Sequence, residues 1–483
     1  MTNTVKRFLK KTVALAGVVL CASSGYALQQ DGEESLIFSE DFEGETMIFS
    51  PSVVGSFPNA PGVKAEMGTD GSRAYGFGRS SCGSTALRNY MSTLTLNLGH
   101  AYAVTRIEFD EIERYGNWGA QGELQLDGVA VSGAIFGREP SNDNHADTGF
   151  RHRSFSIDGI FWTLALNCWD ITTASEIFID NVKIYGRALD VSGPEARIGT
   201  TEYATLADAF DAATDGSTIV LLRDIYHYGY LNVSEKSLVL DGDGHMVYGN
   251  NLNSFIYFFM EPSSDNPRQS IVLRNLTVVN DYVGSSGNPS AIFGSGNCDF
   301  VFTNCTFQSV HPSLGYAVMM GNAINPLRGS LTARDCSFIS GGVGVGVSNV
   351  GCITNRLTDC SVQAVTAFTS FDNETCVTEV DGPATRIEPR SALASSSSGT
   401  LNLILKGGTY TKNPFSYVAP GYGFVDNGNS TWTVFKYPED PSAYTGQTTA
   451  GSYTISIPEQ LDLLSEKTRA GQTYAGSTFT LTD

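Results

Sequence analysis

The sequence is poor in charge, and above all in positive charge. Only 17% of the 483 residues are charged, and 30 Lys and Arg stand against 50 Asp and Glu, which gives a formal net charge of −20. A chain this acidic repels phosphate backbones and anionic lipids, so the composition disfavours nucleic-acid binding. The low charged fraction, together with 51 Gly and 11% aromatic residues, is typical of strands joined by many turns rather than of a coiled coil or a disordered tail.

Long hydrophobic runs are also absent after the N-terminus, so the sequence predicts no transmembrane span. The exception is residues 1–29, where four basic residues precede an apolar run from Thr12 to Ala22 and a stretch of small residues. This order is typical of a secretory signal peptide, and the apolar run is too short for a stable membrane span. We therefore expect a secreted or cell-surface protein.

Six segments in the second half of the chain share one pattern of apolar residues. The apolar residues alternate up to an Asn, Asp or Gly, and immediately afterwards the alternation shifts by one residue. Because strand side chains alternate with a period of two, this shift requires a bend that takes up one residue. Asn, Asp and Gly best tolerate the left-handed backbone of such a bend. The predicted bend residues are Gly244, Asn275, Asn304, Asp335, Asp359 and Gly407.

The bend residues recur at intervals of 31, 29, 31, 24 and 48 residues, and we interpret the last interval as two turns of 24. Coils of this length that bend at the same place predict a right-handed parallel β-helix over residues 195–435. Stacking of the coils places the residue after each bend in one inward-facing column. Its predicted members are His245, Leu276, Cys305, Cys336, Cys360 and Gly408.

The three cysteines of this column allow three interpretations. They are small buried hydrophobic residues, which we favour, or two of them form a disulfide, since neighbouring strands lie about 4.8 Å apart. A metal site is the third interpretation, although ligands in a row on parallel strands do not enclose a tetrahedral ion. We expect His245, in the same column, to be a core histidine rather than a catalytic base.

The start of the predicted β-helix has the pattern of a cap. In residues 196–224, Thr205 and Asp208 have the spacing of a capping box, apolar residues follow at helical spacing, and a buried strand ends the segment. We therefore expect a short N-terminal capping helix. After a linker at 436–451, residues 452–483 repeat this helix–strand pattern. We interpret them as the start of a further repeat unit in a longer protein; the alternative is a lone capping unit.

Residues 36–187 contain short strand-like segments separated by Gly, Asn and Asp turns, which predicts an antiparallel β-sandwich of the jelly-roll type. The predicted fold class of the whole chain is therefore all-β. Tyr115 and Trp118 fall in a loop rich in Gly and Asn. Their rings either stack on a sugar or close the edge of the sandwich.

Three segments of this region, EDFEG, YGNWGAQGELQLDG and IDNVKIYG, resemble secreted jelly-roll modules of the concanavalin-like and MAM-like kind. The resemblance implies binding of a glycan or a protein, with a structural calcium near the first and last strands. The carboxylates that match such a calcium site are Asp41, Glu43 and Asp180. Read without the resemblance, all three are turn residues, which is the interpretation we favour. Calcium is the only cofactor that the sequence suggests.

The start of the predicted β-helix and its late segment GGTYTKNPFSYVAPGYGFVDNGNSTWTV resemble repeat-rich bacterial surface proteins of the pectin-lyase-like superfamily. That superfamily also contains pectate lyases and polygalacturonases, so the resemblance allows an enzyme. The lyase motif R-x-P-x-x-R is approached only by RIEPR at 386–390, with the wrong spacing. The G-H-G of polygalacturonases is replaced by Gly-His-Met at 244–246.

We find no pair of facing carboxylates of the kind that glycoside hydrolysis requires. The sequence therefore favours a non-catalytic interaction protein, an adhesin-like or glycan-binding scaffold. Its expected partner is an extracellular glycan or a surface protein. The alternative is a polysaccharide lyase or glycoside hydrolase that acts on an extracellular polysaccharide. Two facing carboxylates with a nearby Arg or Lys would indicate the enzyme.

Overall fold

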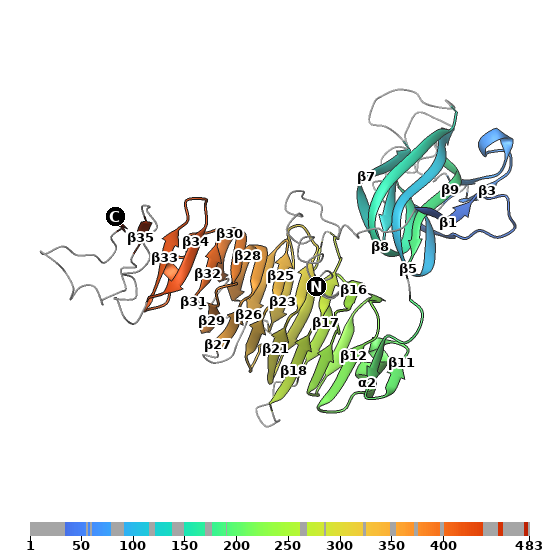
Figure 1. The fold of residues 1–483 in the computed structure, drawn as a ribbon. Coiled ribbons are helices and arrows are strands. Elements are labelled where there is room, and N and C mark those ends of the chain that lie inside the picture. Colours follow the sequence, from blue (N-terminus) through green and yellow to red (C-terminus); the bar gives the residue numbers. More distant parts are fainter. Residues whose placement is uncertain are drawn as a thin grey trace, which may run out of the picture. The chain divides into compact units, whose positions relative to one another are not determined.

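The computed structural model describes residues 34–54, 57, 60–78, 91–114, 121–137, 149–169, 176–189, 191–260, 268–284, 286–321, 325–347, 354–370, 375–396, 400–437, 453–456 and 478–481. The chain divides into two compact units, Met1–Asp190 and Val191–Asp483 (Figure 1). Across these described ranges the structure is all-β, and it contains no helix with the length and hydrophobicity of a membrane span.

Several predictions concern residues outside the described ranges. They are the signal peptide at 1–29, the loop aromatics Tyr115 and Trp118, most of the linker at 436–451, and the helix expected within 452–483.

The first unit is one nine-stranded sheet in which every pairing is antiparallel. Its order is β3-β4-β9-β5-β8-β6-β7, with β1 beside β9 and β2 beside β5. The strands are β1 (Ser35–Glu40), β2 (Ser50–Val54), β3 (Gly62–Lys64), β4 (Ala74–Gly76), β5 (Met91–Arg114), β6 (Gln121–Leu126), β7 (Val129–Gly137), β8 (Arg151–Trp169) and β9 (Glu176–Ala188).

The long strands β5 and β8 let this sheet enclose a core. Their pairing shifts register twice, between Asn97 and Tyr102 and between Val104 and Arg106. Such irregularities bend strands and increase their twist. The enclosed core is rich in aromatic and branched side chains, among them Phe77, Phe109, Phe136, Leu164 and Ile184.

The second unit consists of two long sheets between which the chain alternates. The ten-stranded sheet contains β10 (Ala196–Ile198), β11 (Thr201–Tyr203), β12 (Ser217–Leu221), β15 (Leu238–Asp241), β18 (Gln269–Arg274), β21 (Cys298–Thr303), β24 (Leu331–Arg334), β27 (Thr354–Thr358), β29 (Thr375–Asp381) and β31 (Thr400–Leu405). From β12 to β31 each strand pairs in parallel with the next, in Figure 1 from green to orange.

The seventeen-stranded sheet receives the chain twice in each coil up to β26, and once, as a long strand, in the coils that begin with β27 and β29. Its strands are β13 (Ile225–Tyr228), β14 (Leu231–Ser234), β16 (Met246–Asn250), β17 (Ser254–Phe259), β19 (Thr277–Asn280), β20 (Ser290–Ser295), β22 (Thr306–Ser309), β23 (Tyr316–Met320), β25 (Ser337–Ser340), β26 (Val343–Val347), β28 (Ser361–Ser370), β30 (Arg386–Ser396), β32 (Gly408–Tyr410), β33 (Tyr422–Asp426), β34 (Trp432–Lys436), β35 (Tyr453–Ser456) and β36 (Thr478–Leu481). A coil of the first kind is a strand of the ten-stranded sheet followed by two strands of this one, as in β18, β19 and β20, whereas β28 and β30 each replace such a pair.

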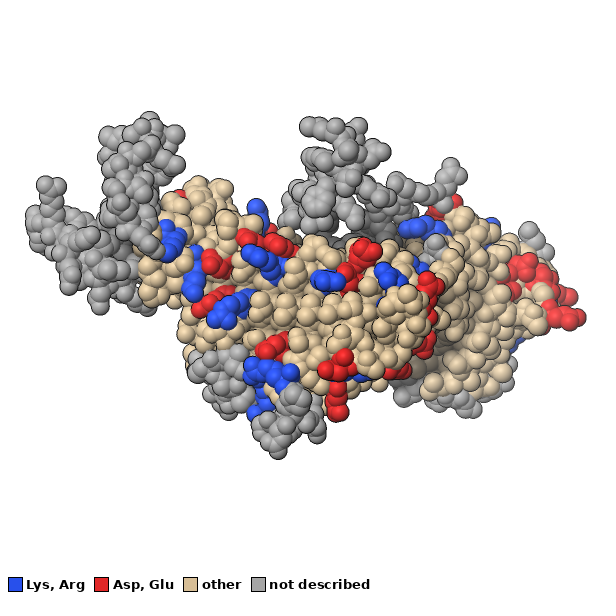
Figure 2. Space-filling view, turned by 60° about the horizontal axis from the view of Figure 1, so that its bottom comes forward, with Lys and Arg blue, Asp and Glu red and all other residues tan. Residues whose placement is uncertain are grey.

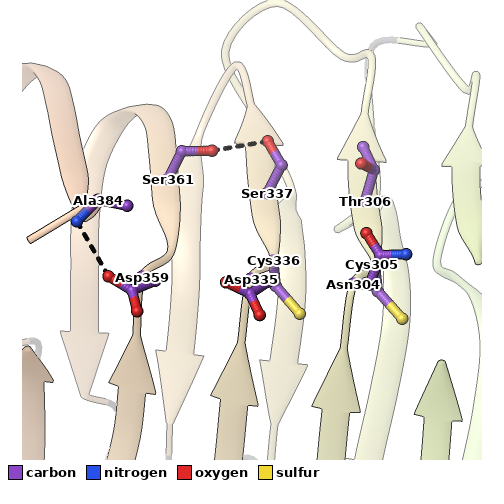
Figure 3. Close-up of a pocket in the computed structure, with 9 residues that line it drawn as sticks. All are labelled: Asn304, Cys305, Thr306, Asp335, Cys336, Ser337, Asp359, Ser361 and Ala384. Carbon is purple, nitrogen blue, oxygen red and sulfur yellow. Dashed lines mark hydrogen bonds between the residues drawn. The ribbon is translucent and has the colours of Figure 1, made fainter. Parts of the chain in front are cut away.

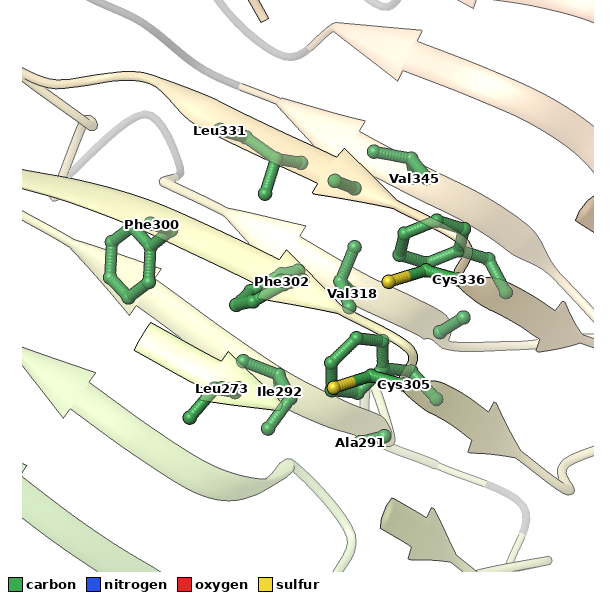
Figure 4. Close-up of a cluster of buried hydrophobic side chains, with 14 of the residues drawn as sticks. Leu273, Ala291, Ile292, Phe300, Phe302, Cys305, Val318, Leu331, Cys336 and Val345 are labelled. Atoms are coloured by element: carbon green, nitrogen blue, oxygen red, sulfur yellow. The ribbon is translucent and has the colours of Figure 1, made fainter. Parts of the chain in front are cut away.

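The coils enclose one continuous apolar core. Along β21, buried and partly exposed residues alternate strictly, which points Phe300 and Phe302 inward. Figure 4 shows these rings beside the side chains of Cys305 and Cys336, inside the coils. The Phe307 and Phe338 rings stack across neighbouring coils with their centroids 5.8 Å apart. Burial of such side chains on every coil is the main source of stability.

A helix covers the first coil. α2 (Leu206–Ala212) begins after Thr205, whose hydroxyl accepts a hydrogen bond from the Asp208 N–H at 3.1 Å, so the predicted N-cap is confirmed. The helix buries Phe210 against the core. Lys236 Nζ donates to the Phe210 and Ala213 carbonyls near its end, which satisfies groups that a helix end leaves free.

At the other end of the unit the parallel pairing stops. β33 and β34 form an antiparallel hairpin after the short 3₁₀ turn η2 (Phe415–Tyr417), and β34 also pairs antiparallel with β32. β35 then adds to β33, and β36 adds to β35. The described parts of 452–483 thus extend this sheet.

Candidate functional site

Four bend residues take the same strained backbone conformation at the same corner of successive coils. Asn275, Asn304, Asp335 and Asp359 have φ of 53°, 51°, 53° and 53°, and each connects a strand of the ten-stranded sheet to one of the seventeen-stranded sheet. Asn and Asp reach this left-handed region at lower cost than other residues with a side chain. One coil earlier the bend is longer, because Gly242, Asp243 and Gly244 together take the place of Asn275, and Asp243 and Gly244 have positive φ of 49° and 89°.

The backbone of the bend is held from coil to coil. The N–H groups of the four residues donate to the carbonyls of Thr303, Arg334, Thr358 and Asp381 in the next coil, at 3.0–3.1 Å. The side chains extend this link, since Asn304 Nδ2 donates to Asn275 Oδ1 at 2.9 Å and Asn275 Nδ2 donates to Asp241 Oδ1 at 3.1 Å. Burial alone would raise the pKa of Asp241, but hydrogen bonds from Asn275, the Asp243 N–H and Arg274 outweigh it and lower the pKa.

The prediction of a left-handed bend at Gly407 is wrong by one residue. Gly408 has the positive φ, 98°, and Gly407 does not. In the coil before it, Gly382 has φ of 96°, and two more residues, Pro383 and Ala384, precede the inward position. The bend of this coil is not recognised in the sequence, where the interval of 48 residues is interpreted as two turns. Its bend is a Gly-Pro step rather than a single Asn or Asp.

The inward column runs through Leu276, Cys305, Cys336 and Cys360, each no more than 2% exposed. It continues through Thr385 to Gly408. The prediction of a core histidine at the start of this column is wrong. The side chain of His245 is 34% exposed, and its Nδ1 lies 3.2 Å from Asp224 Oδ1. A hydrogen bond to a carboxylate near solvent costs less than burial of an imidazole without a partner.

The cysteines of the column are free thiols, as are the other three described cysteines, Cys168, Cys298 and Cys376. Each Sγ donates to the carbonyl two residues earlier, at 3.4, 3.1 and 3.3 Å for Cys305, Cys336 and Cys360. The hydrogen bond with Cys305 and burial raise the pKa of Cys336 to about 12. A thiol that stays protonated is a poor metal ligand, because metals bind the thiolate. Among the described residues, no group of three His, Cys, Asp or Glu is arranged to hold a metal ion.

An open pocket of about 340 Å³ lies along the outer side of this corner, and we call it the ladder pocket (Figure 3). It is lined by Asn304, Cys305, Thr306, Asp335, Cys336, Ser337, Asp359, Ser361 and Ala384. One wall is the column of amide and carboxylate side chains. The other is a column of hydroxyls, Thr306, Ser337 and Ser361, which pair in register on β22, β25 and β28.

Hydrogen bonds fix part of this lining. Ser361 Oγ donates to Ser337 Oγ at 2.9 Å, and Asp359 Oδ1 accepts from the Ala384 N–H at 2.9 Å (Figure 3). Asp359 therefore caps the longer turn of the next coil and is committed to a backbone group. The carboxylate of Asp335 lies between Asn304 and Asp359 and is exposed.

The chemistry available to the ladder pocket follows from its lining. The nine lining residues include two carboxylates but no Lys, Arg or His. Asp335 and Asp359 project from neighbouring coils on the same wall, about 4.8 Å apart along the stack, whereas hydrolysis requires two carboxyl groups that flank the scissile bond. The pocket thus offers a repeating set of hydrogen-bond donors and acceptors without a paired acid and base.

In the first unit, the carboxylates predicted for calcium are bound to backbone groups. Asp180 is 2% exposed, and its Oδ2 accepts from the Thr69 N–H at 2.8 Å. Glu43 accepts from the Arg73 N–H, and Asp41 Oδ1 accepts from the Glu43 N–H at 3.1 Å. These bonds hold the turns around the 3₁₀ helix η1 (Thr69–Gly71), so each carboxylate has a structural partner.

Sequence reasoning missed several buried carboxylates of this unit, among them Glu40 and Glu111. Glu40 binds the Ile48 N–H at 2.7 Å and the Phe42 N–H at 2.8 Å through its two oxygens. Glu111 is fully buried and binds Arg153 Nε at 2.7 Å. The signal for Glu111 was its place inside the alternating strand segment IEFDEIE, where an acid replaces an apolar residue.

Comparisons with known proteins do not assign the chain to a family. No protein-family description matches it, and no curated protein does. Among solved structures it is similar to the K3 cleaved adhesin domain of Lys-gingipain from Porphyromonas gingivalis W83, at 12% identity over 32% of this chain and 100% of that chain, with a TM-score of 0.25.

Two further solved structures are similar to the chain. The CBM22-1 xylan-binding domain from Paenibacillus barcinonensis Xyn10C shares 16% identity over 32% of this chain and 97% of that chain, with a TM-score of 0.23. The Agl-KA catalytic domain shares 11% identity over 76% of this chain and 78% of that chain, with a TM-score of 0.20. At such TM-scores these similarities carry no argument about the function of this chain.

Proposed function

We propose that this chain is a secreted or cell-surface interaction protein without catalytic activity, an adhesin-like or glycan-binding scaffold. In this proposal residues 1–29 direct export, the first unit is a jelly-roll module, and the second unit is a right-handed parallel β-helix of the pectin-lyase-like kind. The observation that carries the proposal is the ladder pocket, with its two columns of hydrogen-bonding side chains and no cationic group in its lining.

The spacing of the two columns favours an extended, hydroxyl-rich ligand. Each coil repeats a hydroxyl and an amide or carboxylate at about 4.8 Å along the stack, which is close to the length of one sugar residue in an extended chain. Thr306, Ser337 and Ser361 are able both to donate and to accept. A glycan that lies along the coils would therefore meet equivalent groups at successive sugar residues.

Charge favours a neutral glycan. Asp335 and Asp359 repel an anionic chain, and the whole protein has a net charge of −20. On the face that Figure 2 shows, acidic and basic side chains are interspersed between areas of uncharged surface, with no large basic area that would attract a polyanion.

The alternative, a polysaccharide lyase or glycoside hydrolase, needs groups that the ladder pocket does not bring together. A lyase requires a base such as Arg or Lys at the site, and none lines the pocket. A hydrolase requires two carboxyl groups on opposite sides of the bond, and Asp359 is bound to the Ala384 N–H. These contacts support binding without turnover.

A glycan array with the chain lacking residues 1–29 tests the proposal. We expect binding to neutral extended glycans and lower binding to uronate-containing ones. The double variant Ser337→Ala, Ser361→Ala removes two hydroxyls of one column, and loss of two hydrogen bonds predicts about tenfold weaker binding. Thr332→Ala, an exposed hydroxyl on β24, is the matched control. Release of reducing ends or of unsaturated uronate would contradict the proposal.

A further inference from the structure

The first coil of the second unit exposes two aromatic side chains that are two residues apart in the chain. Tyr228 and Tyr230 are 54% and 65% exposed, the highest values among the exposed large hydrophobic side chains of the described residues. They flank Gly229 at the corner between β13 and β14. Many aromatic side chains of this unit are instead packed in its core.

The backbone that carries these rings is held in place. Gly229 has φ of 99°, a conformation that residues with a side chain rarely adopt, so the turn depends on this glycine. The His227 imidazole packs against Phe255, with ring centroids 6.3 Å apart, and hydrogen-bonds the backbone of Tyr230. The two rings are thus presented by a turn that is already ordered, which lowers the entropic cost of binding.

A neighbouring pair of tyrosines extends the aromatic surface to the second coil. Tyr226 on β13 pairs in register with Tyr248 on β16, and their ring centroids are 6.2 Å apart. The Tyr248 hydroxyl donates to a carboxylate oxygen of Asp281. Rings with polar tips and a nearby carboxylate form a surface that is both apolar and able to form hydrogen bonds.

We infer that Tyr226, Tyr228 and Tyr230, here called the tyrosine platform, bind the flat face of a neutral sugar ring by stacking. Pyranose rings present C–H groups on one face and hydroxyls at the edge, which match an aromatic face beside a hydrogen-bonding carboxylate. A few exposed rings are far smaller than the roughly 800 Å² per partner of a stable protein interface. Asp281 disfavours an anionic sugar at the same place.

The tyrosine platform is a site separate from the ladder pocket. It lies where β13 meets β14, between the two strands that the first coil contributes to the seventeen-stranded sheet. The ladder pocket lies at the corner between the two sheets, on coils that contain residues 304–384. The inference rests on the proposed glycan binding and adds a second point of attachment, so a chain that reaches both sites would gain avidity.

Affinity gel electrophoresis of the chain lacking residues 1–29 tests the platform. The gels contain hydroxyethyl cellulose, galactomannan or dextran as the probe. The double variant Tyr228→Ala, Tyr230→Ala is expected to bind at least tenfold more weakly than the parent, because loss of stacking on two rings is costly. Tyr228→Phe, Tyr230→Phe keeps the rings and is expected to stay within about threefold. Phe415→Ala, an exposed ring at the other end of the unit, is the control.

The outcomes distinguish failure of the platform inference from failure of the proposed function. If the parent chain is retarded and the Tyr→Ala variant is retarded equally, the platform inference is overturned while the proposed function stands. If no probe retards the parent chain, both are overturned. If Tyr→Phe loses binding as fully as Tyr→Ala, hydroxyl hydrogen bonds rather than stacking carry the contact, which also overturns the inference. A thermal melt of each variant shows that folding is unchanged.

Discussion

The carboxylate of Asp359 accepts a hydrogen bond from the backbone N–H of Ala384, 2.9 Å away and 25 residues later in the chain. The same residue takes the left-handed backbone of the bend, with φ of 53°. One side chain thus shapes its own coil and caps the turn of the next. The preference of Asp for the left-handed backbone and its hydrogen bond to the next coil thus stabilise the same local structure. This agreement is expected for a fold built by stacking.

Replacement of Asp359 tests this double role. Asp359→Ala keeps the chain length but loses the hydrogen bond and disfavours the left-handed region, so we expect a loss of about 2–3 kcal/mol in the free energy of unfolding. Asp359→Asn tolerates the conformation and keeps an acceptor, so we expect a loss below about 1 kcal/mol. Urea unfolding measures both, and equal losses would contradict the assigned role of the bend.

The two glycines of the last coil are expected to differ. A Cβ at Gly408 would lie 2.6 Å from Thr385 Cβ, and the φ there is 98°. At Gly407 the nearest atom would be Asp381 Oδ1 at 3.0 Å, with no positive φ. We therefore predict that Gly408→Ala destabilises the chain by more than about 2 kcal/mol, and Gly407→Ala by clearly less. Thermal melts of the two variants show whether the order holds; the reverse order would place the bend at Gly407.

Asp127 in the β6–β7 turn gives the first unit a pH dependence. Burial raises the pKa of Asp127 to about 6, although its Oδ1 accepts from the Trp162 and Thr163 N–H groups; Oδ2 has no hydrogen-bond partner among the described residues. Because the folded-state pKa lies above the unfolded one, the folded state holds the proton more tightly. This contribution to stability is complete below about pH 3.8 and is lost as pH rises through about 6.

Asp127→Asn removes that titration. The stability of the variant relative to the parent is expected to rise by about 2–3 kcal/mol between pH 3.5 and pH 7.5, the equivalent of a shift of about two pKa units. Guanidinium unfolding at both pH values measures the difference. A relative stability that does not change with pH would show that Asp127 titrates normally.

The cysteine column is expected to resist chemistry in the native state. Cys305, Cys336 and Cys360 are buried, and hydrogen bonding and burial raise the pKa of the Cys336 and Cys360 thiols. We predict that iodoacetamide labels these three in urea but not in the native protein, as peptide mass mapping would show. Cys336→Ala should cost about 1–2 kcal/mol, the cost of a small cavity. A disulfide between Cys336 and either neighbour would contradict the free-thiol column.

The row of bend residues could be predicted because each bend depends on local preferences of the chain. Asn275, Asn304, Asp335 and Asp359 each combine a residue that tolerates positive φ with a shift in apolar alternation, and both signals are visible without neighbours. The turn that contains Pro383 and Ala384 gave no such signal. The residue that follows it in the inward column, Thr385, is not apolar, so the alternation of apolar residues shows no shift there.

What the sequence could not supply depends on neighbouring coils. His245 has the spacing of a core residue, but Asp224 at the same corner of the preceding coil offers its imidazole a partner near solvent. Tyr228 and Tyr230 look like ordinary strand residues. Their exposure follows from their place at a corner, which only the packed structure determines. Glu111 likewise needed Arg153, 42 residues away, to account for a buried acid.

The proposed function depends most directly on what the ladder pocket does with a neutral polysaccharide. Isothermal titration of soluble galactomannan and hydroxyethyl cellulose into the chain lacking residues 1–29, followed by a reducing-end assay of the same samples, measures binding and turnover together. We predict saturable binding to at least one of the two, about tenfold weaker in Ser337→Ala, Ser361→Ala than in Thr332→Ala, with no new reducing ends. Equal affinity of the two variants, or reducing ends that accumulate with time, would contradict the account.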